Sequence, residues 1–298
     1  MAKDGVESYL CSDGKPISTS PLYAGDHSMY DEFRNRDHRL YYTVEPPYKV
    51  ILNGGTNTWT YTANPGDREY IDIMSTLASP GHKTLPTTRW NGRFLKQAPH
   101  FRNFNYGQVW SPTELGYFMY KYYNNITDNS GPVNTTDAPI FRVEEAMLDY
   151  AEAEFELGEF NQSTADMTIN PLRSRAGVQP MNVSDVTASF DTNRDPDVDP
   201  VLWEIRRERR VEFMGEGIRF DDLRRWKKGT YLNKQQLGVW VNNDDYGDAL
   251  TIHGGGTQGY VEFFGAPPGW LDYYYLYPIP KDQLALNPNI KQNPGWPQ

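Results

Sequence analysis

The sequence predicts a mainly α-helical fold with a loop-rich region and a few short strands. Residues 141–157 show the three- and four-residue spacing of apolar side chains that is typical of helices, and Asp199 followed by Pro200 suits the start of a second helix at 201–214. Residues 48–112 lack this period and are rich in Gly, Pro, Asn and Thr, which indicates loops. With 298 residues, the chain is long enough to bury a sizeable core in one or two domains.

The first part of the chain predicts little regular structure. Residues 1–47 are polar and punctuated by turns, with one short helix and one strand expected towards the end of this stretch. Residues 48–112 predict long loops that carry large aromatic side chains. The aromatic run at 115–123 predicts a strand or a buried extended segment.

The middle of the chain carries the clearest helical signal. Within residues 141–157, Val143, Met147 and Tyr150 recur at helical spacing, and Gly158 supplies a stop. A second helical stretch, at 163–176, contains Pro171, which should kink the helix or begin a new one.

A further helical pair is expected after an acidic segment. Residues 191–200 are rich in Asp and Pro and predict a solvated linker, in which Asp199 and Pro200 suit the start of the helix at 201–214. A shorter helix is expected at 218–227, and residues 230–298 predict loops with short strands.

Charge and hydropathy exclude several classes of protein. The net charge is −10 and the pI is near 5.0, so the chain lacks the basic stripe that nucleic-acid binding requires. Mean hydropathy is −0.72, and no apolar run approaches the roughly 18–20 residues of a membrane-spanning helix.

The single cysteine, Cys11, allows no internal disulfide or multi-cysteine zinc site, and the five histidines show no metal-ligand spacing. We therefore expect no metal, no cofactor and no nucleic-acid partner.

Sequence motifs for catalysis are incomplete. The run HGGG at 253–256 resembles an oxyanion-hole loop, but there is no G-x-S-x-G motif, so a glycine turn is expected. Three carboxylate pairs lie on predicted helices among arginines: Glu144 with Glu145, Glu212 with Glu216, and Asp221 with Asp222. The glutamates that alternate with arginines around 206–210 predict ion pairs along a helix face. We expect no catalytic residues.

Aromatic residues in polar, turn-rich surroundings are the candidate ligand-binding residues. They are Trp59, Tyr61, Trp90 and Trp110. A flat aromatic ring matches the apolar face of a sugar, while neighbouring polar groups can bond its hydroxyls. Packing in a core is the alternative interpretation of each, and the sequence leaves it open.

Four stretches, in this order, together resemble the SusD/RagB family of outer-membrane nutrient-binding proteins. They are EFRNRDHRLY at 32–41, FRVEEAMLDYAEAEFELGE at 141–159 with LRSRAGV at 172–178, LWEIRRERRVEFMGEGIRFDDLRRW at 202–226, and YLYPIPKDQLALNPNIKQNPGW at 275–296. The likeness extends from about residue 7 to residue 296 and corresponds to the C-terminal half or so of a family member. It implies a SusD-like α–α superhelix of tetratricopeptide-like helices. Within a single region over 1–298, we expect a variable loop-rich face at 48–115 and a helical core at 141–228.

The resemblance also implies a function, a partner and a location. It implies binding of oligosaccharide or polysaccharide without cleavage at the bacterial outer-membrane surface, and delivery to a SusC-like TonB-dependent transporter. The N-terminal half of a family member would be a further partner. Cys11 is not preceded by an apolar stretch, so we expect the lipoprotein anchor to lie outside this chain. Peptide binding for a peptide importer, glycoside hydrolysis, and a structural role beside the transporter remain alternatives.

Overall fold

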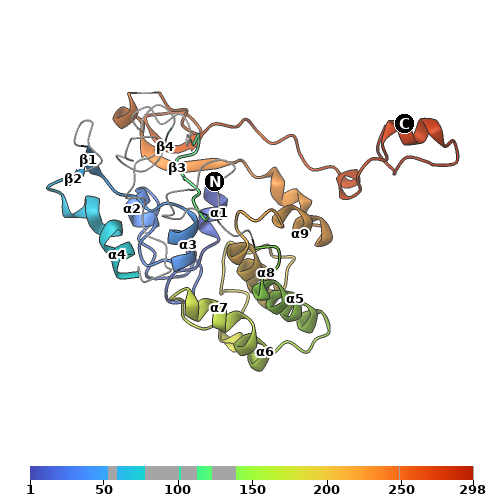
Figure 1. The fold of residues 1–298 in the computed structure, drawn as a ribbon, viewed down its shortest axis with the longest axis horizontal. Coiled ribbons are helices and arrows are strands. Elements are labelled where there is room, and N and C mark those ends of the chain that lie inside the picture. Colours follow the sequence, from blue (N-terminus) through green and yellow to red (C-terminus); the bar gives the residue numbers. More distant parts are fainter. Residues whose placement is uncertain (53–58, 78–100, 102–112, 123–138, 248, 298) are drawn as a thin grey trace. The chain divides into compact units, whose positions relative to one another are not determined.

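The computed structural model describes residues 1–52, 59–77, 101, 113–122, 139–247 and 249–297. These residues form two compact units. The larger unit consists of Met1–Gly215 and Leu237–Phe263, and the smaller unit consists of Glu216–Gln236 and Phe264–Gln298. The regular structure is mainly helical with a few short strands, which confirms the predicted fold class (Figure 1). The assignments of 48–115 as a variable face and 141–228 as a helical core stay predictions.

The first 47 residues contain three short helices, where one helix and one strand were expected. They are α1 (Lys3–Glu7), α2 (Met29–Glu32) and α3 (His38–Thr43). Ser28 and Asp37 each accept a hydrogen bond from an amide in the first turn of the helix that follows, α2 and α3 respectively. The expected strand is reduced to a bridge between Val44 and Met119. Side-chain caps thus mark the starts of α2 and α3 but not of α1, and all three helices are too short to show an apolar period.

Residues 48–77 correct the expectation of long loops. Strand β1 (Val50–Leu52) pairs antiparallel with β2 (Trp59–Tyr61), and a 3-10 turn, η1 (Pro65–Arg68), leads into helix α4 (Glu69–Leu77). Tyr70 and Met74, one helical turn apart, are buried. A helix of nine residues shows too few apolar repeats to stand out among the surrounding turn-forming residues. Within the run at 115–123, Met119 forms a bridge with Val44, residues 121 and 122 form a turn, and Tyr117 and Tyr120 are buried.

Four helices of the larger unit confirm the expectations for the middle of the chain. They are α5 (Val143–Glu156), α6 (Gln162–Met167), α7 (Ile169–Arg175) and α8 (Pro200–Glu212). Helix α5 packs against α8 and also contacts α6 and α7. Gly158 has a φ of 76°, a left-handed conformation that suits glycine just after a helix. Pro171 lies in the first turn of α7, where its missing N–H interrupts no helical hydrogen bond, so it begins a new helix.

The two sides of α5 differ in exposure. Leu148 and Ala151 are fully buried on the side towards the core. Val143, Tyr150 and Leu157 form an apolar stripe on another side and are 70%, 44% and 70% exposed. The apolar residues whose spacing predicted this helix therefore lie largely on its exposed face.

The acidic segment before α8 is not simply a solvated linker. Asp191 and Val198 are buried, and the Asp191 carboxylate accepts hydrogen bonds from the Ser18 hydroxyl at 2.7 Å and the Trp203 indole at 2.9 Å. Asp199 caps α8 as predicted, by accepting from the amide of Val201 at 2.8 Å. One of these partners, Ser18, is 173 residues away from Asp191, a contact that a local acidic composition does not reveal.

Residues 219–298 contain the expected short elements. In the larger unit, strand β3 (Leu237–Asn242) pairs antiparallel with β4 (Gln258–Glu262). The smaller unit holds α9 (Arg219–Arg225), which matches the predicted helix at 218–227, and α10 (Lys281–Leu286). Ring contacts dominate its packing; Trp270 lies 5.1 Å from Tyr275, and Tyr273 lies 4.8 Å from Trp296, between ring centroids.

Tyrosines make up much of the main core, in the larger unit. Tyr9, Tyr48, Tyr70 and Tyr117 are fully buried there. The Tyr117 hydroxyl lies 2.8 Å and 2.9 Å from the two carboxylate oxygens of Glu32, so one polar end is bonded inside the core. The high tyrosine content therefore serves packing as well as surfaces.

The two sides of α5 allow a direct test of its packing. Leu148→Ala should lower the free energy of unfolding by about 2–4 kcal/mol, because it removes fully buried methyl groups and leaves a cavity beside α8. Val143→Ala, on the exposed stripe, should change it by less than about 0.5 kcal/mol. Urea denaturation followed by circular dichroism measures both values, and equal losses would contradict the assignment of the two faces.

Candidate functional site

The structure places one of the predicted ligand-binding side chains at a described surface. Trp59 and Tyr61 lie on β2, and Tyr61 is 42% exposed. The side chain of Trp59, and all of Trp90 and Trp110, lie outside the described residues. The grouping of these four aromatics into one site stays a prediction.

Tyr61 is held between the hairpin and the turn that precedes α4. It lies opposite Val50 in the β1–β2 ladder, and Val50 is buried. The guanidinium carbon of Arg68 lies 3.8 Å from the centroid of the Tyr61 ring. Arg68 in turn pairs with Asp72, one helical turn further on, at 2.9 Å. A planar cation thus orients the exposed ring.

Polar groups follow Tyr61 directly in the chain. The Thr62 hydroxyl donates to the Asp67 carboxylate at 2.5 Å, and the Asn64 side-chain carbonyl accepts from the amide of Gly66 at 3.0 Å. Asn64 also donates to Asp67 at 3.3 Å. Amide, hydroxyl and carboxylate groups therefore lie close in sequence to an exposed aromatic ring. Such a surface can stack on a sugar and exchange hydrogen bonds with its hydroxyls.

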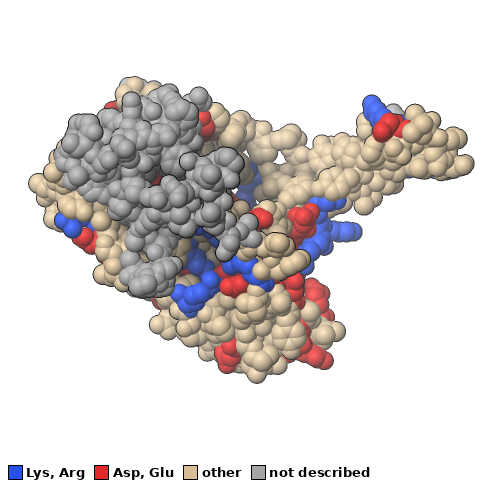
Figure 2. Space-filling model, viewed as in Figure 1, with Lys and Arg blue, Asp and Glu red and all other residues tan. Residues whose placement is uncertain are grey.

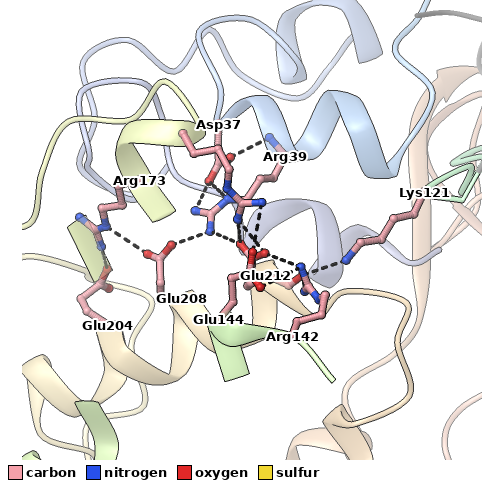
Figure 3. A network of polar contacts seen from close by, with 10 residues as sticks. Asp37, Arg39, Lys121, Arg142, Glu144, Arg173, Glu204, Glu208 and Glu212 are labelled. Atoms are coloured by element: carbon pink, nitrogen blue, oxygen red, sulfur yellow. Dashed lines mark hydrogen bonds and ion pairs between the residues drawn. The ribbon is translucent and has the colours of Figure 1, made fainter. Parts of the chain in front are cut away.

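Helix α8 carries the densest cluster of charges (Figure 3). Glu212, at its C-terminal end, is met by arginines from three other segments: Arg39 at 3.0 Å, Arg142 at 2.9 Å and Arg175 at 2.7 Å. Lys121 donates to the backbone carbonyl of Glu212 at 2.8 Å. This residue therefore joins α3, α7 and the start of α5 to the end of α8.

The cluster continues along α8 towards its N-terminus. Glu208 pairs with Arg39 at 2.6 Å and with Arg173 at 3.0 Å, and Arg173 also reaches Glu204 at 3.4 Å. The side chains of Glu204, Glu208 and Arg173 are at most 1% exposed. Every one of these carboxylates has a cationic partner, as burial of charge requires.

Ion pairs along the face of α8 explain only part of the Arg–Glu pattern. The pair between Arg207 and Glu204, at 2.9 Å, follows the expected spacing within the helix. Arg209 instead pairs with Asp149 of α5 at 2.7 Å, and Arg210 pairs with Asp4 of α1. The arginines of α8 thus hold other segments in place.

The electrostatics of Glu212 suit a structural ion pair. Burial alone would raise its pKa, but the charge of Arg39 and the hydrogen bond from Arg175 outweigh that effect and lower the pKa of Glu212 to about 2. A general acid must hold a proton near neutral pH. Glu212 is ionised there, so its place among three arginines favours a structural role.

The described surface shows mixed charge. On the face drawn in Figure 2, basic and acidic side chains lie beside one another, with no broad basic patch among the described residues. Within the same residues there is no cluster of metal-ligating side chains and no helix long and apolar enough to cross a membrane.

The depressed pKa of Glu212 predicts loss of stability in acid. The carboxylate stabilises the folded state above its ordinary pKa of 4.5, and this contribution is lost as the pH falls towards about 2. A shift of this size corresponds to about 3 kcal/mol. Asp191, whose pKa burial would raise but Arg207 lowers, adds to the same trend.

Urea denaturation at several pH values between 2 and 6 measures this effect. As the pH falls from 6 to 2, Glu212→Gln should lose about 3 kcal/mol less of its free energy of unfolding than the wild type does. Asp149→Asn is the matched control, because it removes a carboxylate that is 59% exposed and should change the decline by less than about 1 kcal/mol. An unchanged decline in the Glu212 variant would show that this carboxylate is not held at low pKa.

Comparison with known proteins places these features in context. The chain is 32% identical over 161 residues to the starch-binding protein SusD of Bacteroides thetaiotaomicron, a match that covers 54% of this chain and 22% of that protein. A SusD-like protein of Bacteroides fragilis has a similar fold, with a TM-score of 0.56 and 22% identity over 99% of this chain and 46% of that one. The solved structure of BT4246 gives a TM-score of 0.59 and 19% identity over 99% of this chain and 44% of that one. The chain thus spans less than half the length of these relatives.

The match to a family covers more of the chain than the sequence match to the starch-binding protein does. The profile of the SusD family covers residues 1–296, which is nearly the whole chain and includes both compact units. The resemblance drawn from the four stretches of sequence is confirmed, and the chain belongs to the SusD family.

Proposed function

We propose that this chain binds a neutral oligosaccharide or polysaccharide without cleaving it, as part of glycan uptake. The family match over residues 1–296 carries this proposal, because the SusD family is a family of binding proteins. The match to a starch-binding relative supports a glycan as the ligand class. Starch itself is the first ligand to test.

The described surface around Tyr61 supports the same ligand chemistry. An exposed aromatic ring backed by Arg68 can take the apolar face of a sugar ring. The carboxylates of Asp67 and Asp72 and the side chain of Asn64 lie nearby and can bond sugar hydroxyls. Trp59, Trp90 and Trp110 are the further residues we propose for this surface.

We place the chain at the outer-membrane surface. SusD family proteins are surface lipoproteins of the outer membrane. We propose delivery of the glycan to a SusC-like TonB-dependent transporter, with the part of a family member that this chain does not span as a further partner. In this scheme the glycan is bound first and then transported. The protein must therefore release the glycan uncleaved.

Affinity electrophoresis tests the proposal. The folded chain should be retarded in native gels that contain soluble starch or another neutral polysaccharide, and reducing ends should not accumulate on incubation. A folded chain that migrates unretarded through every glycan gel would contradict the proposal and favour peptide cargo. Release of reducing ends would identify a hydrolase.

Single substitutions test the proposed aromatic surface. Tyr61→Ala should weaken glycan binding by about tenfold, the loss expected of one exposed aromatic anchor. Tyr150→Ala is the matched control, because Tyr150 is 44% exposed on α5 and lies away from the hairpin in sequence. Trp59→Ala, Trp90→Ala and Trp110→Ala should likewise weaken binding. Circular dichroism accompanies each measurement, since unfolding of a tryptophan variant would assign that residue to the core.

A further inference from the structure

The outer face of the β3–β4 pair carries a second group of aromatic side chains. Trp240 and Tyr260 are partners in the ladder, so both project from the same face. Their neighbours in the strands, Val239, Val241 and Val261, point to the opposite face and are buried. Trp240 and Tyr260 keep part of their surface exposed. The strand pair thus has an apolar inner face and an aromatic outer face.

His27 extends this aromatic face, although it is more than 200 residues away in sequence. Its ring is nearly parallel to the Trp240 ring, with centroids 5.1 Å apart and an angle of 16° between the planes. His27 is itself exposed. Two flat rings are therefore stacked at the surface, with the outer one open to solvent.

Hydrogen bonds hold the segment that carries His27 in place. The neighbouring Asp26 accepts from the Tyr260 hydroxyl at 2.8 Å and pairs with Lys3 at 2.6 Å. The Lys3 ammonium also lies 4.9 Å from the centroid of the Tyr260 ring. Burial and the hydrogen bond to Asp26 raise the pKa of Tyr260 to about 12, so its hydroxyl stays a donor. The aromatic face is thus fixed before any ligand arrives.

Polar groups surround the rings. Asn242 and Gln258 form a pair two residues further along the ladder, on the same face as the rings, and Gln258 is exposed. Glu262, two residues from Tyr260 on the same strand, pairs with His253 at 2.7 Å. Amides and carboxylates around flat rings can bond hydroxyl groups while the rings meet C–H groups.

We propose that the face formed by His27, Trp240 and Tyr260 is a second glycan-binding surface, which takes a ring of a neutral sugar. The proposal rests on the proposed function of the chain. The net charge of −10 disfavours uronic acids and sulfated sugars, whereas Asp26 and Glu262 beside the rings are paired with Lys3 and His253.

A second surface has a consequence for avidity. Both the Tyr61 surface and this one belong to the larger unit, but they lie on different strand pairs. One long glycan that reaches both surfaces is bound more tightly than a short oligosaccharide that fills only one. Loss of either surface should therefore weaken binding of a polymer without abolishing it.

Affinity electrophoresis with matched variants tests this inference. The gels contain soluble starch, xyloglucan or galactomannan as neutral polymers and polygalacturonate as an acidic one. Trp240→Ala and His27→Ala should each weaken retardation by a neutral polymer about five- to tenfold, while the control Tyr150→Ala should not change it. His27→Ala removes only an exposed ring, so this variant should stay folded. It therefore tests the second surface even if Trp240→Ala fails to fold.

The outcomes separate the two proposals. If a neutral polymer retards the wild-type chain and His27→Ala and folded Trp240→Ala migrate as the wild type does, the second surface is wrong and the proposed function stands. If no neutral polymer retards the folded wild-type chain, both are wrong. Retardation by polygalacturonate that depends on His27 would overturn the choice of a neutral sugar.

Discussion

The larger unit depends on the pairing of charges that helix α8 carries into the interior. Glu204, Glu208 and Glu212 are each at most 4% exposed, and a buried carboxylate without a partner costs several kcal/mol. Arg39, Arg142, Arg173 and Arg175 supply those partners from other parts of the chain. Desolvation of the charges offsets part of their attraction, so the network stabilises the fold by less than the sum of its ion pairs. It does make alternative packings of these segments costly, because each would leave a charge unpaired.

The same pairing reaches the surfaces that we propose for glycan. Arg210 pairs with Asp4, and Arg207 donates to the backbone carbonyl of Ser8, so α8 fixes α1 and the residues just after it. Helix α1 packs against β3 and carries Lys3, which pairs with Asp26 beside the aromatic face of β3–β4. Interior charges and an exterior aromatic surface are therefore linked through a helix of five residues. A substitution in α8 should accordingly affect the aromatic surface through α1.

Much of the helical structure could be predicted from local sequence, and the aromatic face of β3–β4 could not. Asp199 and Pro200 marked the start of α8, and the spacing of Val143 and Tyr150 marked α5, because capping and periodicity are local properties. Helix α4 is too short for such a pattern, and the linker prediction missed the burial of Asp191, one of whose partners, Ser18, lies 173 residues away. Tyr61 was recognisable as an aromatic residue in a polar loop. Trp240 and His27 were not, since only the folded chain brings them together.

Several contacts of α8 join residues that are far apart in sequence. This separation affects how the chain folds during synthesis. Arg39 and Glu212 are 173 residues apart, and Ser8 and Arg207 are 199 apart. During synthesis, the N-terminal segment emerges long before α8, which neutralises and anchors it. Arg39 therefore stays hydrated until two of its carboxylate partners, Glu208 and Glu212, have been made. Contacts this distant in sequence slow folding, because a long loop must close before they form. The early segment is therefore a natural place for a chaperone to act, and a stalled or truncated chain that lacks α8 should be an efficient target for proteolysis.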